Sequence, residues 1–197
     1  MNETQDFQET VNLLQVKRCW GLNVINHVDV EKVQASVNAI KVDQAKARRV
    51  NKVEGEWICE GSQGPQFRAD FQLETGKVTL EVDSPSFLGG TGTRPGPLHY
   101  CVFGLTSCFA STFMTLAAME GIEIKAAKFA GECNVDFSKT FGLSDRPIIQ
   151  NAKFKVTVRS SASREVLRRL TKLAEERCPG IYSLTNKISV ETELATE

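Results

Sequence analysis

The longest uncharged stretch of the sequence covers residues 96–119 and contains no Asp, Glu, Lys or Arg. Pro97 follows a glycine-rich run and suits the first position of a helix, and Gly121 provides a glycine stop. A helix that is apolar on every side is either buried or transmembrane. Because Ser, Thr, His and two Cys residues dilute this segment and no neighbouring segment resembles it, the pattern predicts the buried central helix of a soluble domain.

Before the central helix, apolar residues recur with a period of two, which is typical of strands. Three such runs lie at residues 50–59, 67–71 and 77–82. The turns between them, at residues 61–65 and 74–76, are short and rich in glycine. Since short connections join antiparallel neighbours, the pattern predicts an antiparallel meander.

After the central helix, residues 122–136 and 151–159 alternate as two further strands, and residues 186–194 alternate as a final strand. The segment 163–178 lies between them and has the period of an amphipathic helix. Ser163 suits its N-cap. Its predicted buried stripe consists of Val166, Leu167, Leu170, Leu173 and Ala174. The element order βββ-α-ββ-α-β predicts an α+β fold of antiparallel sheets around a buried helix.

The first 46 residues have a different character and are predicted to form an N-terminal helical extension. A short helix-prone run covers residues 7–17. A clearer helix covers residues 29–42, where Asp29 can cap the first turn and apolar residues recur at helical spacing. The main domain is then residues 47–197.

The charge balance of the sequence limits the classes of molecule that the protein is expected to bind. The chain has 197 residues, of which 41% are hydrophobic, and its 24 basic and 24 acidic residues give no formal net charge. This balance argues against nucleic acid or an anionic membrane as the main partner. The acidic, polar start does not resemble a signal peptide, so a cytoplasmic location is predicted.

The cysteine thiols are the candidate reactive groups of this sequence. No C-x-x-C motif is present and neither histidine lies near a cysteine pair, so no metal or other cofactor is expected. Cys108 lies in the middle of the central helix, where a free Cys either packs as a small hydrophobe or reacts as a thiol. Cys101 shares its helical face, but two turns separate the Cα atoms by about 10 Å, too far for a disulfide. Three other cysteines are interpreted as structural: Cys19, Cys59 and Cys133.

Two segments resemble the OsmC/Ohr family: Gly96-Pro-Leu-His-Tyr-Cys-Val-Phe-Gly-Leu-Thr-Ser-Cys-Phe109 and Leu173-Ala-Glu-Glu-Arg-Cys-Pro179. The run Leu88-Gly-Gly90 is also similar to this family. The resemblance covers roughly residues 47–194 and leaves out the N-terminal extension. It implies an OsmC-like fold built as an intertwined homodimer, with active sites at the subunit interface.

The resemblance also implies thiol-dependent reduction of organic hydroperoxides in oxidative-stress defence. Cys108 falls where the family has its peroxidatic cysteine, and Cys178 where it has the resolving one. Cys108 would become a sulfenic acid and Cys178 would condense with it to a disulfide. An external dithiol or lipoyl-type reductant would then regenerate the thiols. The expected partners are therefore a small-molecule hydroperoxide, this reductant and a second copy of the chain.

A thiolate within an apolar helix needs a nearby cation, because apolar surroundings raise the pKa of a thiol. The family's peroxidases supply an Arg paired with a Glu, and the position of that Glu aligns with Leu98 here. Arg68 is nearest in register to the family's Arg, and Arg94 is nearest along the chain. The chain is therefore similar to divergent branches of the family.

Two other interpretations stay open. A non-catalytic OsmC-like protein would bind a small apolar ligand or sense oxidants at the dimer interface, and the missing Glu favours it. The glycine-rich residues 89–96 before a helix are also similar to a phosphate-binding loop. They match neither phosphate fingerprint, since no Gly-Lys-Ser/Thr follows and Pro95 replaces the third glycine.

Overall fold

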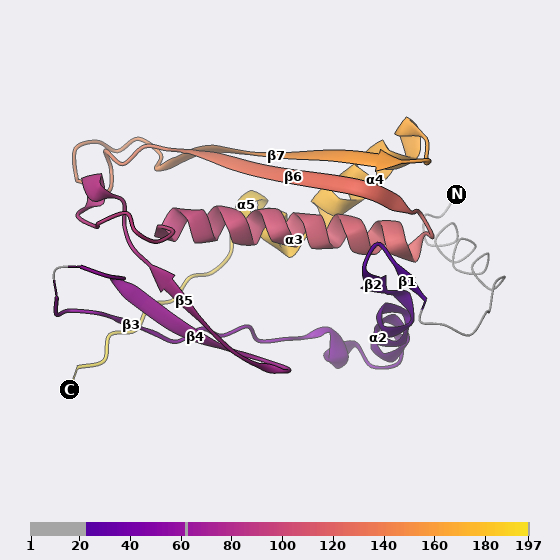
Figure 1. Ribbon diagram of the computed structural model, residues 1–197, viewed down its shortest axis with the longest axis horizontal. Helices are drawn as coiled ribbons and strands as arrows, with labels where there is room; N and C mark the ends of the chain where they lie inside the picture. Colours follow the sequence, from indigo (N-terminus) through magenta and orange to yellow (C-terminus); the bar gives the residue numbers. More distant parts are fainter. Residues whose placement is uncertain (1–22, 62, 197) are drawn as a thin grey trace. The chain divides into compact units, whose positions relative to one another are not determined.

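The structure is a computed structural model that describes residues 23–61 and 63–196 (Figure 1). The predicted helix at residues 7–17 and Cys19 lie outside the described residues. The chain divides into two compact units: one holds Ala39–Gly104, and the other joins the chain up to Asn38 with Leu105 onwards.

The unit Ala39–Gly104 contains the predicted meander. A short 3-10 helix, η1 (Gln44–Ala47), precedes the strands β3 (Gly55–Trp57), β4 (Phe67–Leu73) and β5 (Gly76–Val82). The sheet order is β3-β4-β5 and both pairings are antiparallel, as predicted from the short turns.

The glycine-rich loop after β5 is folded around a buried carboxylate. It includes a second 3-10 helix, η2 (Ser86–Leu88). Asp83 is 1% exposed and accepts hydrogen bonds from the backbone N–H groups of Thr91 (3.1 Å) and Thr93 (2.9 Å) and from both hydroxyl groups. The Thr91 hydroxyl and the other donors lower the pKa of Asp83 to about 2. Since the chain's own carboxylate occupies these donors, the loop does not offer them to a phosphate.

The second unit is built on a long hairpin of β6 (Ile124–Val135) and β7 (Ile149–Ser160), which pair antiparallel as predicted. The central helix α3 covers Pro97–Met119 and ends in a left-handed glycine, Gly121 (φ 69°). The backbone of β6 approaches α3 closely at Gly131, where a Cβ atom would lie 2.0 Å from the Thr106 hydroxyl oxygen. Any larger residue at Gly131 would push the helix and the hairpin apart.

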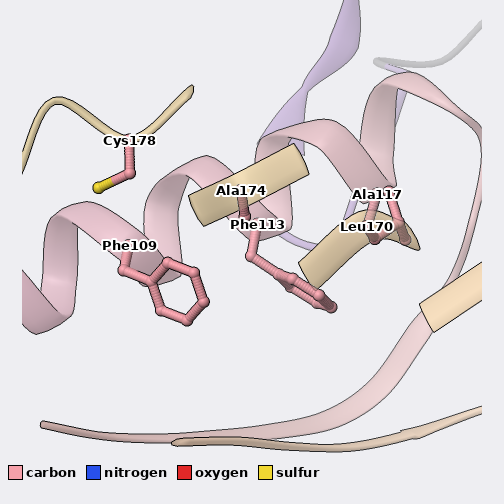
Figure 2. Packing of buried hydrophobic residues seen from close by; sticks show 6 residues of the cluster. All are labelled: Phe109, Phe113, Ala117, Leu170, Ala174 and Cys178. Carbon is pink, nitrogen blue, oxygen red and sulfur yellow. The ribbon is translucent and has the colours of Figure 1, made fainter. Parts of the chain in front are cut away.

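The second half of α3 forms the core of this unit. The fully buried Phe113 contacts Phe129 of β6 edge-on, with ring centroids 5.8 Å apart, and Phe109 contacts Phe129 and Phe154 at 6.1 and 6.0 Å. Figure 2 shows both rings pointing away from the segment that carries Cys178. Leu170 and Ala174 of the helix α4 (Arg164–Arg177) are fully buried in the same cluster.

The helix α4 (Arg164–Arg177) has the predicted cap and stripe. The Ser163 hydroxyl accepts a hydrogen bond from the Val166 backbone N–H (3.3 Å). Leu170 and Ala174 are fully buried, and Val166 and Leu167 pack against the core from partly buried positions. Leu173, the fifth predicted member of the stripe, is partly buried. Arg169 forms an ion pair with Glu120, at the end of α3.

The predicted final strand at residues 186–194 is wrong for the described chain. Pro179 ends α4 and begins another helix, α5 (Pro179–Thr185), after which the described chain is extended but has no strand partner. A strand forms only where an edge offers backbone hydrogen bonds. Without one, the alternating apolar residues stay exposed, as Val190 (79%) and Leu194 (87%) are.

The helix predicted at residues 29–42 is confirmed as α2 (Val30–Val42), with the Lys32 backbone N–H donating to the Asp29 carboxylate (3.1 Å). A small hairpin that the sequence pattern did not predict precedes it: β1 (Val24–Ile25) and β2 (Val28–Asp29). The side-chain amide of Asn26 pairs with the backbone of Ile122 and Ile124, at 2.8 and 2.7 Å.

The prediction that α3 is buried holds only for its second half. Phe109, Phe113, Ala117 and Ala118 are buried, whereas Phe103 in the first half is 69% exposed. Within the described part of the chain, α3 is the one helix long and apolar enough to cross a membrane, by length and composition only.

Candidate functional site

Cys108 lies at the middle of α3, directly before Phe109, the first buried residue of the helix. Its side chain is half-buried and packs against the core cluster. Its backbone carbonyl accepts a hydrogen bond from the Thr112 hydroxyl (3.0 Å), one turn further on. The thiol is therefore carried by a regular helix that packs against the core cluster.

Cys178 lies at the joint between α4 and α5 and is fully buried. Its backbone N–H donates to the Ala174 carbonyl (3.0 Å) and closes α4, and its own carbonyl accepts from the Tyr182 N–H (2.9 Å) and opens α5. One residue is thus the last cap of one helix and the first cap of the next. The joint fixes the direction in which the Cys178 thiol points.

The fold brings these two cysteines together. Cys108 packs against the buried cluster that contains Cys178, and the neighbouring Cys178 thiol raises the pKa of Cys108, although seventy positions separate the two in the sequence. Gly180, two residues after Cys178, contacts Cys108 as well: a Cβ atom at Gly180 would lie 3.5 Å from the Cys108 sulfur. Two neighbouring thiols can form a disulfide when one of them is oxidised.

The environment of Cys108 favours the protonated form of its thiol. Burial raises the pKa of Cys108 above its ordinary value of 9.0, and the hydrogen bond and the charge of Cys178 act in the same direction. The backbone N–H of Gly180 opposes them and lowers this pKa. The net shift is upward, so Cys108 is mainly a thiol at neutral pH.

The two predicted arginines lie in the other unit, Ala39–Gly104, and each has a carboxylate partner there. Arg68 of β4 forms an ion pair with Glu56 of β3 (3.5 Å). Arg94, in the loop before α3, donates to Glu81 of β5 (2.8 Å). These pairs hold both guanidinium groups at the three-stranded sheet, and a role for either one at Cys108 stays a prediction.

The other described cysteines stand apart from this pair. Cys101 and Cys59 are exposed and Cys133 is half-buried, and each carries a free thiol. The exposure of Cys59 does not fit a packed structural residue. Among the described residues, no group of three His, Cys, Asp or Glu side chains could hold a metal ion.

Sequence reasoning did not single out Gly180 or the helix α5. The sequence does contain a signal for α5, because Pro179 suits the first position of a helix as well as the position directly after the preceding one. A helix that begins directly after Cys178 turns the following peptide back toward Cys108. This turn makes Gly180 the third member of the candidate site, beside the two cysteines.

The fold and the sequence together define the class of protein. The family profile of OsmC-like proteins matches residues 90–193, which is more than half of the chain. The chain belongs to the OsmC-like family. The matched region includes both Cys108 and Cys178. A comparison with curated proteins found no significant match.

Solved structures share the fold. The crystal structure of an OsmC-like protein from Mycoplasma pneumoniae has a TM-score of 0.52 and 17% identity, and the match covers 70% of this chain and 88% of that one. An OsmC-like protein of unknown function from Vibrio cholerae has a TM-score of 0.50 and 18% identity, with 76% and 99% covered. At these identities the likeness shows the fold. The OsmC-like family and fold indicate a soluble protein, and the one apolar helix of the described chain, α3, is weak evidence for a membrane span.

Proposed function

We propose that this protein reduces organic hydroperoxides with the thiols of Cys108 and Cys178, as part of oxidative-stress defence in the cytoplasm. The observation that supports the proposal is that both thiols lie at one core cluster, inside the region that matches the family. Cys108 is the nucleophile because it is partly accessible, and Cys178 is the resolving residue because it is fully buried behind it.

The reaction balances with two thiols and one hydroperoxide. The Cys108 thiolate attacks the terminal oxygen, an S–O bond forms, the O–O bond breaks, and the alkoxide leaves with a proton as the alcohol. The Cys178 sulfur then attacks the sulfenic acid, which forms the disulfide and releases water. Thiol–disulfide exchange with an external dithiol or lipoyl-type reductant returns both cysteines to thiols.

The raised pKa of Cys108 makes the first step slow at neutral pH, because the thiolate is the nucleophile. A cation at the thiol would reverse this shift, and Arg68 and Arg94 are the predicted candidates. Each would have to exchange its present carboxylate partner, Glu56 or Glu81, for the sulfur. We therefore expect peroxide reduction to accelerate as the pH rises.

The test is oxidation of the reduced protein by a stoichiometric organic hydroperoxide, followed by intact mass and disulfide mapping. Wild type is expected to form a Cys108–Cys178 disulfide. Cys178→Ser is expected to accumulate a sulfenic or over-oxidised Cys108, and Cys108→Ser is expected to remain unchanged. Cys101→Ser is the matched control, because it removes an exposed thiol from the same helix and should react as wild type does.

The raised pKa of Cys108 also favours a second function: a non-catalytic protein that senses oxidants or binds a small apolar ligand. A protonated, half-buried thiol suits slow oxidation or simple packing better than rapid turnover. An unchanged mass of wild type over minutes, at neutral and at alkaline pH, would refute the peroxidase and leave this second function. A single oxidation without regeneration by dithiols would identify the sensor.

A further inference from the structure

We propose that the outer face of the β6–β7 hairpin binds the phosphate backbone of double-stranded nucleic acid, without preference for its sequence. This face carries four cations and one carboxylate, all of them exposed: Lys128, Lys153, Lys155, Arg159 and Glu132. The formal net charge of the whole chain is zero, so this positive charge is local. A local field of one sign attracts a polyanion even when the total charge of the protein does not.

The alternation of the two strands separates this outer face from the core. Phe129 of β6 pairs in register with Val156 of β7, and both pack against the core cluster. Successive side chains of a strand point to opposite faces, so the next pair, Lys128 and Thr157, points outward. Figure 1 shows β6 and β7 as one long ribbon, and the outward residues form a continuous surface along it.

The β7 side of this face is a row of residue types that bind phosphate. Its successive outward positions, about 6.8 Å apart in a strand, are Lys153, Lys155, Thr157 and Arg159. One strand of a duplex carries a phosphate about every 3.4 Å along the axis, so the spacing of the row matches every second phosphate. Lys, Arg and Thr side chains all donate to phosphate oxygens in complexes with nucleic acids.

Three of the four cations are available to an external anion. Lys153 forms an ion pair with Glu132 on the opposite strand, with 3.6 Å between nitrogen and oxygen. The ion pairs of the described residues include none that involves Lys128, Lys155 or Arg159. Each of these three can therefore contact a phosphate and release a counterion that is condensed on the nucleic acid.

The uncharged positions of the same face favour a duplex over other polyanions. They hold only small or polar side chains: Ala126, Ala130, Asn134, Asn151 and Thr157. Single-stranded nucleic acid is bound by stacking its bases on aromatic rings, and elements that lie on a membrane insert apolar side chains into it. This face offers neither group. A duplex has one charge per about 1.7 Å of its axis and binds through its phosphates alone.

The first experiment measures binding of the full chain to a fluorescently labelled DNA duplex by anisotropy, at a series of salt concentrations. With three phosphate contacts, the affinity is expected to fall about fortyfold between about 50 and 200 mM salt, a logarithmic slope of about −2.7. A duplex of unrelated sequence should bind equally well. No binding at low salt would overturn the inference, as would tighter binding to single-stranded DNA or to phosphatidylserine vesicles than to the duplex.

The second experiment assigns the binding to this face. Lys128→Gln and Lys155→Gln are each expected to weaken binding and to reduce the salt slope by about 1. Glu132→Gln should strengthen binding and steepen the slope, because it removes a repelling carboxylate and frees Lys153. Lys32→Gln is the matched control, because it removes a cation whose side chain is 84% exposed on α2, away from the hairpin. Equal weakening by Lys32→Gln would show that total charge determines the binding, and would contradict the inference.

Discussion

Cys108 is balanced between two opposing sets of contacts. Burial and the neighbouring Cys178 thiol favour the protonated sulfur, and a single backbone donor, Gly180, favours the thiolate. Since burial is the largest of these influences, the balance lies on the side of the thiol. The reactivity of this residue is therefore governed by how far its surroundings exclude water and by which groups approach the sulfur.

This balance predicts a steep pH dependence. Below its pKa a thiol gains about tenfold in thiolate fraction for each pH unit. Because burial raises the pKa of Cys108 above its ordinary value, its alkylation rate is expected to rise by this factor per unit through neutral pH and into the alkaline range. Stopped alkylation with mass analysis measures the rate. A plateau reached near neutral pH would show that a cation has lowered the pKa of Cys108.

Thr106 carries a buried hydroxyl that has no hydrogen-bond partner among the described residues. An unpaired buried hydroxyl costs about 1–3 kcal/mol relative to a satisfied one. Thr106→Val replaces the hydroxyl by a methyl group of similar shape and is expected to raise the free energy of unfolding by about 1 kcal/mol. Thr106→Ser is the control, because it keeps the hydroxyl and removes the methyl group. Urea unfolding compares them, and a less stable Thr106→Val would indicate a partner for the hydroxyl.

At the residue scale the sequence resemblance named two candidate thiols, and it gave no indication of what shifts their pKa. Cys108 and Cys178 were named from the resemblance of their contexts to a family, and the structure places both at one core cluster. Gly180 was not named, because its role depends on a helix that begins at Pro179. Hydrogen-bond direction at a helix joint is a property of three-dimensional geometry and leaves no periodic pattern in the sequence.

Among the elements, the β1–β2 hairpin shows how a weak sequence signal hides a defined structure. Asn26 and His27 both have left-handed backbones, with φ of 55° and 65°, as a type I′ turn requires. Asn-Gly is the usual sequence of such a turn, and His in place of Gly concealed it. Two-residue strands on either side add no alternation that a pattern search could detect.

His27→Gly is expected to stabilise the hairpin. A non-glycine residue in the left-handed region costs about 1 kcal/mol or more, which glycine avoids. Asn26→Ala should act in the opposite direction, because it removes both hydrogen bonds to the backbone of Ile122 and Ile124, worth about 2 kcal/mol together. Thermal unfolding measures both variants. If Asn26→Ala were neutral, the amide would not be holding the hairpin to the start of β6.

The longer elements were predictable because their apolar periods extend over many residues. The strands β4 to β7 and the helices α2, α3 and α4 all appear at the predicted places. The structure of residues 186–194 was not predictable in this way. Their alternating pattern is typical of a strand, but no strand within the described chain pairs with them. Periodicity predicts which faces are apolar, and the identity of the neighbouring element comes from the tertiary structure.

At the scale of the whole molecule, one described chain leaves apolar groups uncovered that its sequence places in a core. Phe103 in the first half of α3 is 69% exposed, and apolar side chains of the C-terminal segment are exposed as well: Ile188, Val190 and Leu194. Burying such side chains is worth about 1.5–3 kcal/mol each. The homodimer predicted from the family resemblance would supply a surface to cover them.

We therefore expect the protein to be a dimer in solution, with twice the mass of the chain by light scattering. Phe103→Asp should shift it toward monomer, because an interface would have to bury the new carboxylate without a partner. Phe103→Leu keeps an apolar side chain and should remain dimeric, which separates loss of the interface from loss of the aromatic ring. A wild type that stays monomeric at all concentrations would refute the dimer. An unaltered Phe103→Asp dimer would place the interface away from this part of α3.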